Sequence, residues 1–244
     1  MQLIEEPPLT GMLIADRYQR LIARLREAAE RAGRDPEAFQ VVAVTKGFDA
    51  TVVQRAREAG LRRFGENRVQ EGLVKVAAVP DAEWHLVGRL QANKVRPAIG
   101  AFAVIHSVDS LDLLRRMDQI AAEEARIPIA LLEVNLSGEP SKAGFDATWF
   151  ATELRQPGAL LASLDALRAV RVSGLMTIGV AGASVEDARQ LFGRLRQLRD
   201  ELVQQTGQAL PDLSMGMSGD AEAAVAEGAS LVRIGTAIFG PRPG

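Results

Sequence analysis

Residues 41–47 read VVAVTKG, a run of apolar and mostly β-branched side chains that ends in Lys46 and Gly47. Such a run, with a helix-forming segment before it and a glycine after it, predicts a short buried parallel strand. Alternate side chains of a strand share a face, so Lys46 lies on the face of Val44 and Val42. Two interpretations stay open for a lysine in this place. It is a partly desolvated amine suited to forming a Schiff base with an aldehyde, or an ordinary lysine where the strand reaches the surface.

The rest of the chain repeats the order of strand and helix. Apolar runs predict seven further strands at 61–67, 84–88, 101–108, 127–136, 170–179, 211–217 and 230–235. Helical spacing predicts helices at 12–31, 50–59, 69–78, 92–98, 110–125, 185–205 and 220–227, with one or two more around Pro157 and Gly158.

This alternation predicts an α/β fold, a single closed (β/α)8 barrel of the TIM type with an extra N-terminal helix. An open doubly wound sheet is the alternative, but no GxGxxG turn follows the first strand. No linker or shift of composition divides the chain, so we expect residues 1–244 to form one domain.

Composition narrows the function classes. The 244 residues carry 29 basic and 31 acidic side chains, which gives no reason to expect a nucleic-acid partner. The absence of cysteine excludes disulfides, thiolate metal sites and a cysteine nucleophile, and we expect no metal. No apolar run approaches the roughly 20 residues of a membrane span, and the start MQLIEEPPLT is not typical of a signal peptide. We therefore expect a cytoplasmic protein.

In a barrel of this type the site lies at the carboxyl ends of the strands, where Lys46 is placed by its own strand. Other polar residues occupy matching positions after their strands: Glu66, Asn67, His106, Ser107, Asn135 and Ser218. Some of them serve only as helix caps, which we expect for Ser107 and Asp109.

The last two predicted strands indicate a phosphate site. The segment MGMSGD places Ser218 between glycines before a helix, and VRIGTAIFG places Gly235 and Thr236 after the final strand. Glycines let backbone N–H groups approach a ligand, and a helix N-terminus favours an anion. Phosphate sites of barrel enzymes often follow strands seven and eight. The alternative is that these glycines only make tight turns.

Arg233 lies inside the eighth predicted strand, between Val232 and Ile234. A buried arginine needs hydrogen-bond acceptors. It therefore pairs with a barrel carboxylate such as Glu133 or Glu66, or it contacts the ligand.

Several segments together resemble the pyridoxal phosphate homeostasis protein family, whose barrel is similar to the N-terminal domain of alanine racemase (fold type III). They are AVTKG, FGENRVQE, WHLVGRLQANK, HSVDS, VNLSGEPSKAGF, SGLMTIG and LSMGMSGDAEAAVAEGASLVRIGTAIFGPR, and they cover nearly the whole chain. The resemblance implies the cofactor pyridoxal 5′-phosphate (PLP), held as a Schiff base on Lys46. It also implies roles for the following residues: Ser218, Gly235 and Thr236 at the phosphate, Arg233 at the pyridine nitrogen, Asn67 and Met176 at the ring, and Lys142 as a further lysine that accepts or passes on PLP.

The chemistry of these residues favours binding over turnover. An arginine opposite the pyridine nitrogen donates a hydrogen bond and leaves that nitrogen unprotonated, which makes the ring a weaker electron sink. Racemisation needs an acid/base group on each face of Cα, and Lys46 supplies one. The only tyrosine, Tyr18, lies on the predicted outer helix, and His85 alternates with apolar residues as a core histidine does.

We therefore expect a monomeric protein that holds PLP and buffers it or delivers it to PLP-requiring apoenzymes, without being an enzyme itself. Two alternatives stay open: a slow PLP-dependent amino acid racemase or lyase, and a cofactor-free barrel that binds a sugar phosphate.

Overall fold

The computed structural model describes residues 9–139, 141–156 and 158–242. Its strands all run parallel to their neighbours. In chain order they are β1 (Gln40–Val44), β2 (Arg63–Glu66), β3 (Glu83–Leu86), β4 (Val104–Val108), β5 (Ile129–Asn135), β6 (Phe145–Asp146), β7 (Arg171–Met176), β8 (Asp212–Ser214) and β9 (Leu231–Ile234).

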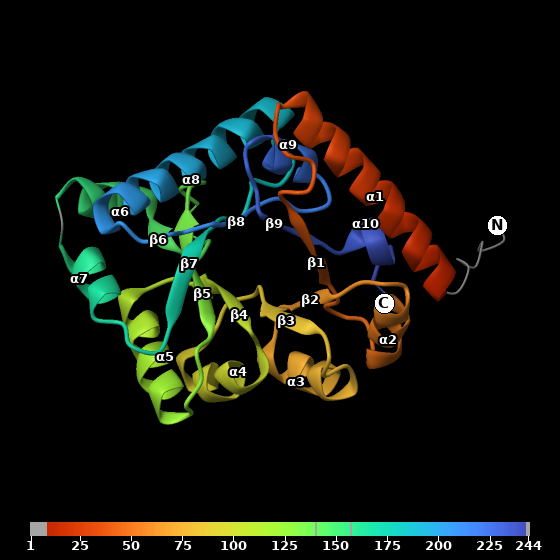
Figure 1. Ribbon diagram of the computed structural model, residues 1–244, viewed down its shortest axis with the longest axis horizontal. Helices are drawn as coiled ribbons and strands as arrows, with labels where there is room; N and C mark the ends of the chain where they lie inside the picture. Colours follow the sequence, from red (N-terminus) through yellow and green to blue (C-terminus); the bar gives the residue numbers. More distant parts are fainter. Residues whose placement is uncertain (1–8, 140, 157, 243–244) are drawn as a thin grey trace.

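Eight of these strands close into a barrel (Figure 1). The order around the sheet is β4-β3-β2-β1-β9-β8-β7-β5, and β4 also pairs with β5, which completes the ring. Between β1 and β9 the register places Val42 beside Arg233, two residues that both point inward. The remaining strand, β6, is a two-residue addition to the end of β5. The predicted closed (β/α)8 barrel is therefore confirmed.

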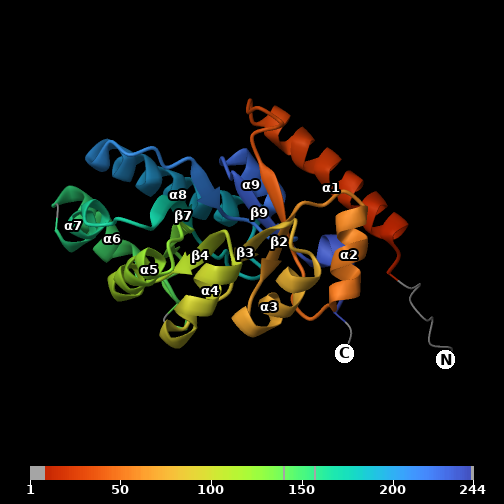
Figure 2. The same ribbon diagram turned by 60° about the horizontal axis from the view of Figure 1, so that its bottom comes forward.

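Helices surround the barrel and connect its strands (Figures 1 and 2). They are α1 (Gly11–Arg31), α2 (Ala50–Glu58), α3 (Val69–Ala78), the 3₁₀ turn η1 (Ala92–Lys94), α4 (Val95–Ala101), α5 (Leu111–Glu123), α6 (Ala147–Arg155), α7 (Ala159–Asp165), α8 (Val185–Thr206), α9 (Ala221–Ala226) and α10 (Thr236–Phe239). Among the helices of the described ranges, none is both long and apolar enough to cross a membrane.

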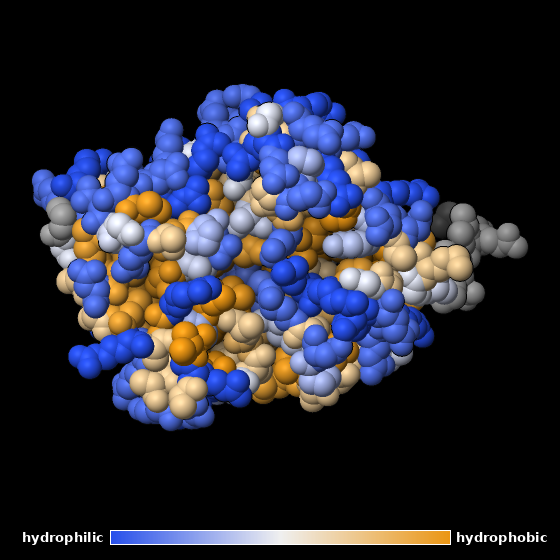
Figure 3. Space-filling model, viewed as in Figure 1, coloured by the Kyte–Doolittle hydropathy of each residue, from blue (hydrophilic) through white to orange (hydrophobic). Residues whose placement is uncertain are grey.

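The extra N-terminal helix α1 packs along the outside of the barrel against α2, α9 and α10 (Figure 1). Its buried side chains follow helical spacing, with Ile14, Leu21, Leu25 and Ala28 on the inner face. Thr10 caps the helix by accepting a hydrogen bond from the N–H of Leu13. On the face seen in Figure 3 the outer surfaces of α1 and α8 are mostly hydrophilic, as expected for helices that bury one side only.

The apolar core has two parts. The larger part fills the space between the strands and the helices, and includes Phe64, Phe150 and Phe192. The smaller part lies inside the barrel and consists of Val42, Val104, Leu131, Met176 and Leu231. The inner cluster fills only part of the interior, and polar side chains occupy the remainder.

The differences from the predicted elements are small. The region around residue 157 contains two helices, α6 and α7; Pro157 itself lies outside the described residues. The short elements β6 and α10 were not predicted, because two- and four-residue elements show no periodicity. Residues 1–8 and 243–244 lie outside the described ranges, so one domain over all of 1–244 stays a prediction.

Candidate functional site: a pocket at the carboxyl ends of the strands

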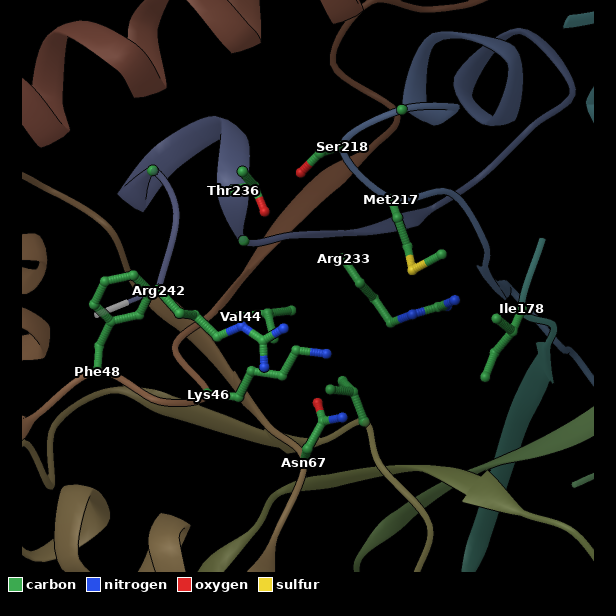
Figure 4. Close-up of a pocket in the computed structure, with 14 residues that line it drawn as sticks. Val44, Lys46, Phe48, Asn67, Ile178, Met217, Ser218, Arg233, Thr236 and Arg242 are labelled. Atoms are coloured by element: carbon green, nitrogen blue, oxygen red, sulfur yellow. The ribbon is translucent and has the colours of Figure 1, made fainter. Parts of the chain in front are cut away.

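A cavity of about 430 Å³ opens at the carboxyl ends of the barrel strands (Figure 4). Its volume lies in the range typical of small-molecule sites. Residues from six strand ends and from the C-terminal segment line it: Val44, Lys46, Phe48, Asn67, Val87, Ile178, Met217, Ser218, Gly219, Arg233, Gly235, Thr236, Gly240 and Arg242. The wall therefore combines cationic side chains, hydroxyls, glycines and apolar groups.

Lys46 enters this cavity from the end of β1. Val42 lies in the apolar cluster inside the barrel and Val44 lines the pocket, so the alternation of side chains along the strand carries Lys46 to the same inner face. The side chain is half-buried, and Figure 4 shows its amine pointing into the cavity. Lys46 therefore lies in the wall of a pocket and not at a fully solvated strand end.

A buried lysine holds the backbone on both sides of Lys46. Lys75 of α3 is 3% exposed, and its Nζ donates to the carbonyl oxygen of Thr45 at 2.7 Å. The same Nζ donates to Oε1 of Glu66 at 2.6 Å and to Oε1 of Glu71 at 2.7 Å. Glu71 in turn accepts the N–H of Gly47 at 2.7 Å. The peptide groups before and after Lys46 are therefore tied to one charged cluster behind the strand.

Burial and hydrogen bonding shift the pKa values of the two carboxylates of this cluster in opposite directions. Burial raises the pKa of Glu66, although hydrogen bonds from Lys75 and Thr45 oppose it. Burial acts the same way on Glu71, but hydrogen bonds from Lys75 and the Gly47 N–H outweigh it and lower the pKa. Within the described residues, Oε2 of Glu66 is buried without a hydrogen-bond partner.

The role of Lys75 could not be predicted from the sequence. Lys75 lies one helical turn after Glu71, a spacing that is usual for exposed ion pairs, and no neighbouring residue marks it as buried.

The loops after β8 and β9 meet on one side of the cavity. Ser218 accepts a hydrogen bond from the N–H of Ala237 at 3.3 Å, which joins the β8 loop to the start of α10. Gly235 immediately precedes α10 and Thr236 begins it, and the first N–H groups of a helix have no acceptor within the helix. Figure 4 shows the hydroxyls of Ser218 and Thr236 facing the same space. This side of the pocket offers donors to an anion.

Two glycines here are required by geometry. Gly216 has φ +89°, and a Cβ atom on it would lie 2.5 Å from the Cβ of Ala224. A Cβ on Gly235 would lie 3.2 Å from the carbonyl oxygen of Val44. The glycines therefore allow the β8 loop to pack closely against α9 and the end of β9 to pack closely against β1, as well as access to a ligand.

Arg233 reaches the cavity from inside β9 and is 5% exposed. Its Nη1 donates to Oγ of Ser214 at 2.6 Å and its Nη2 donates to the carbonyl oxygen of Thr177 at 2.8 Å. Burial lowers its pKa to about 10, while the charges of Glu133 and Asp220 act in the opposite direction. The guanidinium therefore remains protonated at neutral pH and can only donate hydrogen bonds.

The expected ion pairs of Arg233 are corrected by the structure. Glu66 points outward from β2 toward Lys75 of α3, on the other side of the sheet from Arg233. Glu133 is buried inside the barrel and its charge acts on Arg233, but no ion pair joins the two side chains within the described residues. Arg233 lines the pocket, which is the position that the other alternative, a contact with the ligand, requires.

Six of the seven predicted cofactor-binding residues line the cavity. They are Lys46, Asn67, Ser218, Arg233, Gly235 and Thr236. Met176 does not: it is fully buried in the apolar cluster inside the barrel. Ile178, two residues further along the same face, reaches the pocket instead, and Met217 contributes a sulfur-bearing side chain from the β8 loop. Met176 lies on the same face of β7 as Ile178, but one layer of side chains below the cavity.

The other strand-end candidates serve the barrel and its loops. Asn135 binds the loop after β5 through the carbonyl oxygens of Glu139 and Lys142. Ser107 donates to the carbonyl oxygen of Gly88 at 2.7 Å and so is not the helix cap we expected, because Ser110 caps α5. Lys142 does not line the cavity. Its Nζ donates to Glu139 at 2.6 Å and to the Gly179 carbonyl at 3.2 Å.

The fold and the pocket together define a class: a parallel barrel of the alanine racemase type with a lysine at the end of its first strand. The sequence matches the family described as Alanine racemase, N-terminal domain, over residues 17–243. Solved alanine racemases of Clostridium difficile share the fold at 12–14% identity, with TM-scores of 0.69 and 0.71. The barrel covers 60% and 58% of those chains.

Closer relatives narrow this class. The chain is 40% identical over 95% of its length to the pyridoxal phosphate homeostasis protein of Aquifex aeolicus, covering 99% of that protein. It is 42% identical over 94% of its length to the protein of the same name in Pseudomonas aeruginosa, covering 96% of it. The chain belongs to the family of pyridoxal phosphate homeostasis proteins.

The structure of one relative contains bound PLP. PipY of Synechococcus elongatus has been solved with PLP bound, and it matches this chain at 41% identity with a TM-score of 0.78. The match covers 93% of this chain and 100% of PipY. The PLP-free structure of PipY matches at a TM-score of 0.81 with the same coverage.

Proposed function

We propose that this protein binds pyridoxal 5′-phosphate in the pocket at the strand ends and serves in PLP homeostasis, by buffering the cofactor or delivering it. The observation that carries the proposal is the meeting of three groups in one cavity: an amine, a guanidinium and a pair of hydroxyls. The names of the curated relatives and the PLP-bound structure of PipY support it.

Several polar groups of the pocket each fit one part of this ligand. The Lys46 amine is the proposed partner of the aldehyde: its nitrogen replaces the aldehyde oxygen in a C=N bond, and one water molecule leaves. Ser218, Gly235 and Thr236 offer hydroxyl and N–H donors suited to the phosphate. Arg233 is the proposed donor to the pyridine nitrogen, and Asn67 lines the cavity beside Lys46.

Bound PLP supplies a reactive aldehyde and an electron-withdrawing ring. Arg233 retains its proton at neutral pH, since its pKa is about 10. It therefore donates a hydrogen bond and leaves the ring nitrogen without a proton of its own. This arrangement holds the cofactor while weakening its capacity to stabilise a carbanion, which suits storage and delivery better than turnover.

The proposal extends to the setting in which the protein works. We propose a cytoplasmic monomer that passes PLP to PLP-requiring apoenzymes, with Lys142 as a second amine able to accept the cofactor. The large apolar side chains exposed in the described ranges are dispersed over α1, α3, the start of α8 and several loops, among them Met12, Val74 and Ile127. Sedimentation velocity should give a mass near 26.2 kDa; a stable dimer would contradict this part of the proposal.

The test is covalent trapping. We expect the purified protein to take up PLP with a visible absorbance band, which borohydride abolishes by reducing the C=N bond and fixing the label on Lys46. Peptide mapping then locates the label. Lys46→Ala should lose both the band and the label and remain folded by circular dichroism, whereas the matched control Lys142→Ala should retain both. A wild-type protein that takes up no PLP would refute the proposal, and a label mapping to Lys142 would refute the role of Lys46.

A further inference from the structure

A continuous chain of hydrogen bonds crosses the interior of the barrel. It begins at Arg233 in the pocket wall and passes to Oγ of Ser214 at 2.6 Å. Ser214 is 2.8 Å from Nδ1 of His106, and Nε2 of His106 is 2.8 Å from Nδ1 of His85. Nε2 of His85 is 2.8 Å from Oε1 of Glu83. Glu83 begins β3, so the chain ends at the amino ends of the strands, opposite the pocket.

This chain occupies space that barrels usually fill with branched apolar residues. Ser214 and His106 are fully buried, and His85 is 1% exposed. Each of the three bonds at both ends to another member of the chain. Buried polar groups are costly unless they are paired, so a chain without gaps is the form in which they are tolerated.

The two ends of the chain fix the direction of every hydrogen bond in it. A guanidinium only donates and a carboxylate only accepts. Arg233 therefore donates to Ser214, the Ser214 hydroxyl donates to Nδ1 of His106, Nε2–H of His106 donates to Nδ1 of His85, and Nε2–H of His85 donates to Glu83. Both histidines are then neutral and carry their proton on Nε2.

The reverse direction leaves a group unsatisfied. If His85 carried a second proton, it would donate from Nδ1 to His106, and His106 would donate to Ser214. Ser214 would then accept from both neighbours, and its own hydroxyl hydrogen would have no acceptor among its contacts in the chain.

The electrostatics of the interior agree with a neutral His106. Burial lowers the pKa of His106 well below its usual value, and the neighbouring His85 side chain and the positive charge of Arg233 act in the same direction. The hydrogen bond from His85 lowers the pKa of Glu83, which keeps this end of the chain ionised. Arg63 also binds Glu83, at 3.0 Å, while Glu133 and Asp220 face Arg233 at the other end.

We propose that Ser214, His106, His85 and Glu83 act as positioning residues: they form a one-directional hydrogen-bond relay that holds the Arg233 guanidinium in the orientation it presents to the pocket. The relay anchors Nη1 through Ser214, the Thr177 carbonyl anchors Nη2, and the remaining N–H donors stay available to a ligand. The consequence for PLP rests on the function proposed above, whereas the relay itself does not.

The first experiment reads the relay without any ligand. The chain has two histidines, so long-range proton–nitrogen NMR of ¹⁵N-histidine protein gives two imidazole signals, assigned with His106→Gln. We expect both to be neutral and protonated on Nε2 at pH 7. A histidine that is doubly protonated at pH 7, or neutral with its proton on Nδ1, would overturn the relay.

The second experiment breaks the link between His106 and Arg233. Ser214→Ala removes the hydroxyl that joins them, and Ser214→Thr restores a hydroxyl. The matched control is Ser173→Ala on β7, because Ser173 is also buried, at 2% exposed, and bonds to Asp212 instead of to the relay. We expect Ser214→Ala to shift the His106 nitrogen signals, to weaken PLP binding about tenfold and to move the visible band of bound PLP. Ser214→Thr should recover all three, and Ser173→Ala should leave them unchanged.

The outcomes separate the relay from the function. If Ser214→Ala matches Ser173→Ala in PLP affinity, visible band and histidine signals, the positioning role is refuted, while Lys46-dependent PLP binding still stands. If the wild-type protein takes up no PLP, the proposed function fails, and the histidine signals still decide whether the relay exists.

Discussion

Glu133 is a buried carboxyl group in the barrel interior whose pKa is strongly raised. It is 4% exposed and lies on the inner face of β5. Burial raises its pKa from 4.5 to about 7, Asp109 acts in the same direction, and Arg233 and Arg89 oppose them. The folded protein therefore retains a proton on Glu133 that the unfolded chain has released. The free energy of unfolding should fall as pH rises from about 4.5 to 7 and then level off.

Glu133→Gln should remove this pH dependence because glutamine does not titrate. Between pH 5 and pH 8 the wild type should lose about 2–3 kcal/mol more unfolding free energy than the variant. Urea unfolding at both pH values measures the difference. Glu201→Gln, on the exposed face of α8, is the matched control and should behave as the wild type. Equal pH dependence in the wild type and Glu133→Gln would show that Glu133 is ionised in the folded state.

Single residues also show what the sequence could and could not predict of the site. The face of Lys46 was predictable because alternate side chains of a strand share a face. The place of Arg233 at the pocket was implied only by the family resemblance, because the pattern of its own strand left its face open. Met176 was assigned to the pocket wrongly because the same period does not say how deep along the strand the pocket begins. Lys75 and Ser214 were missed because their partners come from residues distant in sequence, such as Thr45 and Arg233.

At the scale of elements, Asp118 of α5 holds the segment that leads into β7. Its carboxylate accepts the N–H groups of Arg168, Ala169 and Val170 at 2.8–3.0 Å. Burial alone would raise the pKa of Asp118, but these three hydrogen bonds lower it below its usual value. Asp118→Ala should reduce the unfolding free energy at pH 7 by on the order of 2 kcal/mol, because three N–H groups lose their acceptor.

The pH dependence of the unfolding free energy tests whether the Asp118 carboxylate causes this loss of stability. A lowered folded-state pKa means that the stabilisation is present above the ordinary value of 3.8 and is lost as pH falls through the folded-state value. Unfolding curves of the wild type and Asp118→Ala should therefore converge toward pH 3. Asp165→Asn, on the exposed end of α7, is the control and should change neither curve. A deficit that is the same at pH 3 and pH 7 would point to lost packing instead of the charge.

The elements were predicted well where they are long and regular. Residues 69–78 form a helix with the bounds expected from the sequence, and the helix expected at 12–31 begins one residue earlier. All eight barrel strands were predicted, most directly those such as β1 and β5 that are mainly apolar, as buried parallel strands usually are. The helix α10 was not, since its four residues follow a strand of similar composition, and it supplies Thr236 to the pocket.

Over the whole molecule, the side chains suited to acid/base chemistry lie away from the pocket, with one exception. Both histidines bond within the barrel interior. Tyr18 lies on α1 beside Arg63 and Gln40, which are at the amino ends of their strands. Among the pocket-lining residues in the described ranges, Lys46 is the one amine, and no histidine, tyrosine or carboxylate accompanies it. One such group serves one face of a substrate Cα, and racemisation requires two.

We therefore expect the PLP-loaded protein to retain the α-deuterium of 2-deuterated alanine. Any loss of deuterium should be no faster than the slow loss that free PLP alone causes. Mass spectrometry of the recovered amino acid measures the loss, and chiral chromatography measures any inversion. Lys46→Ala incubated with the same PLP concentration is the matched control. Deuterium loss or inversion that depends on Lys46 would mean that water or a substrate group supplies the second face, and the pocket would then be that of a slow racemase. Retention of deuterium in both samples would mean that this arrangement of side chains binds PLP without catalysing racemisation.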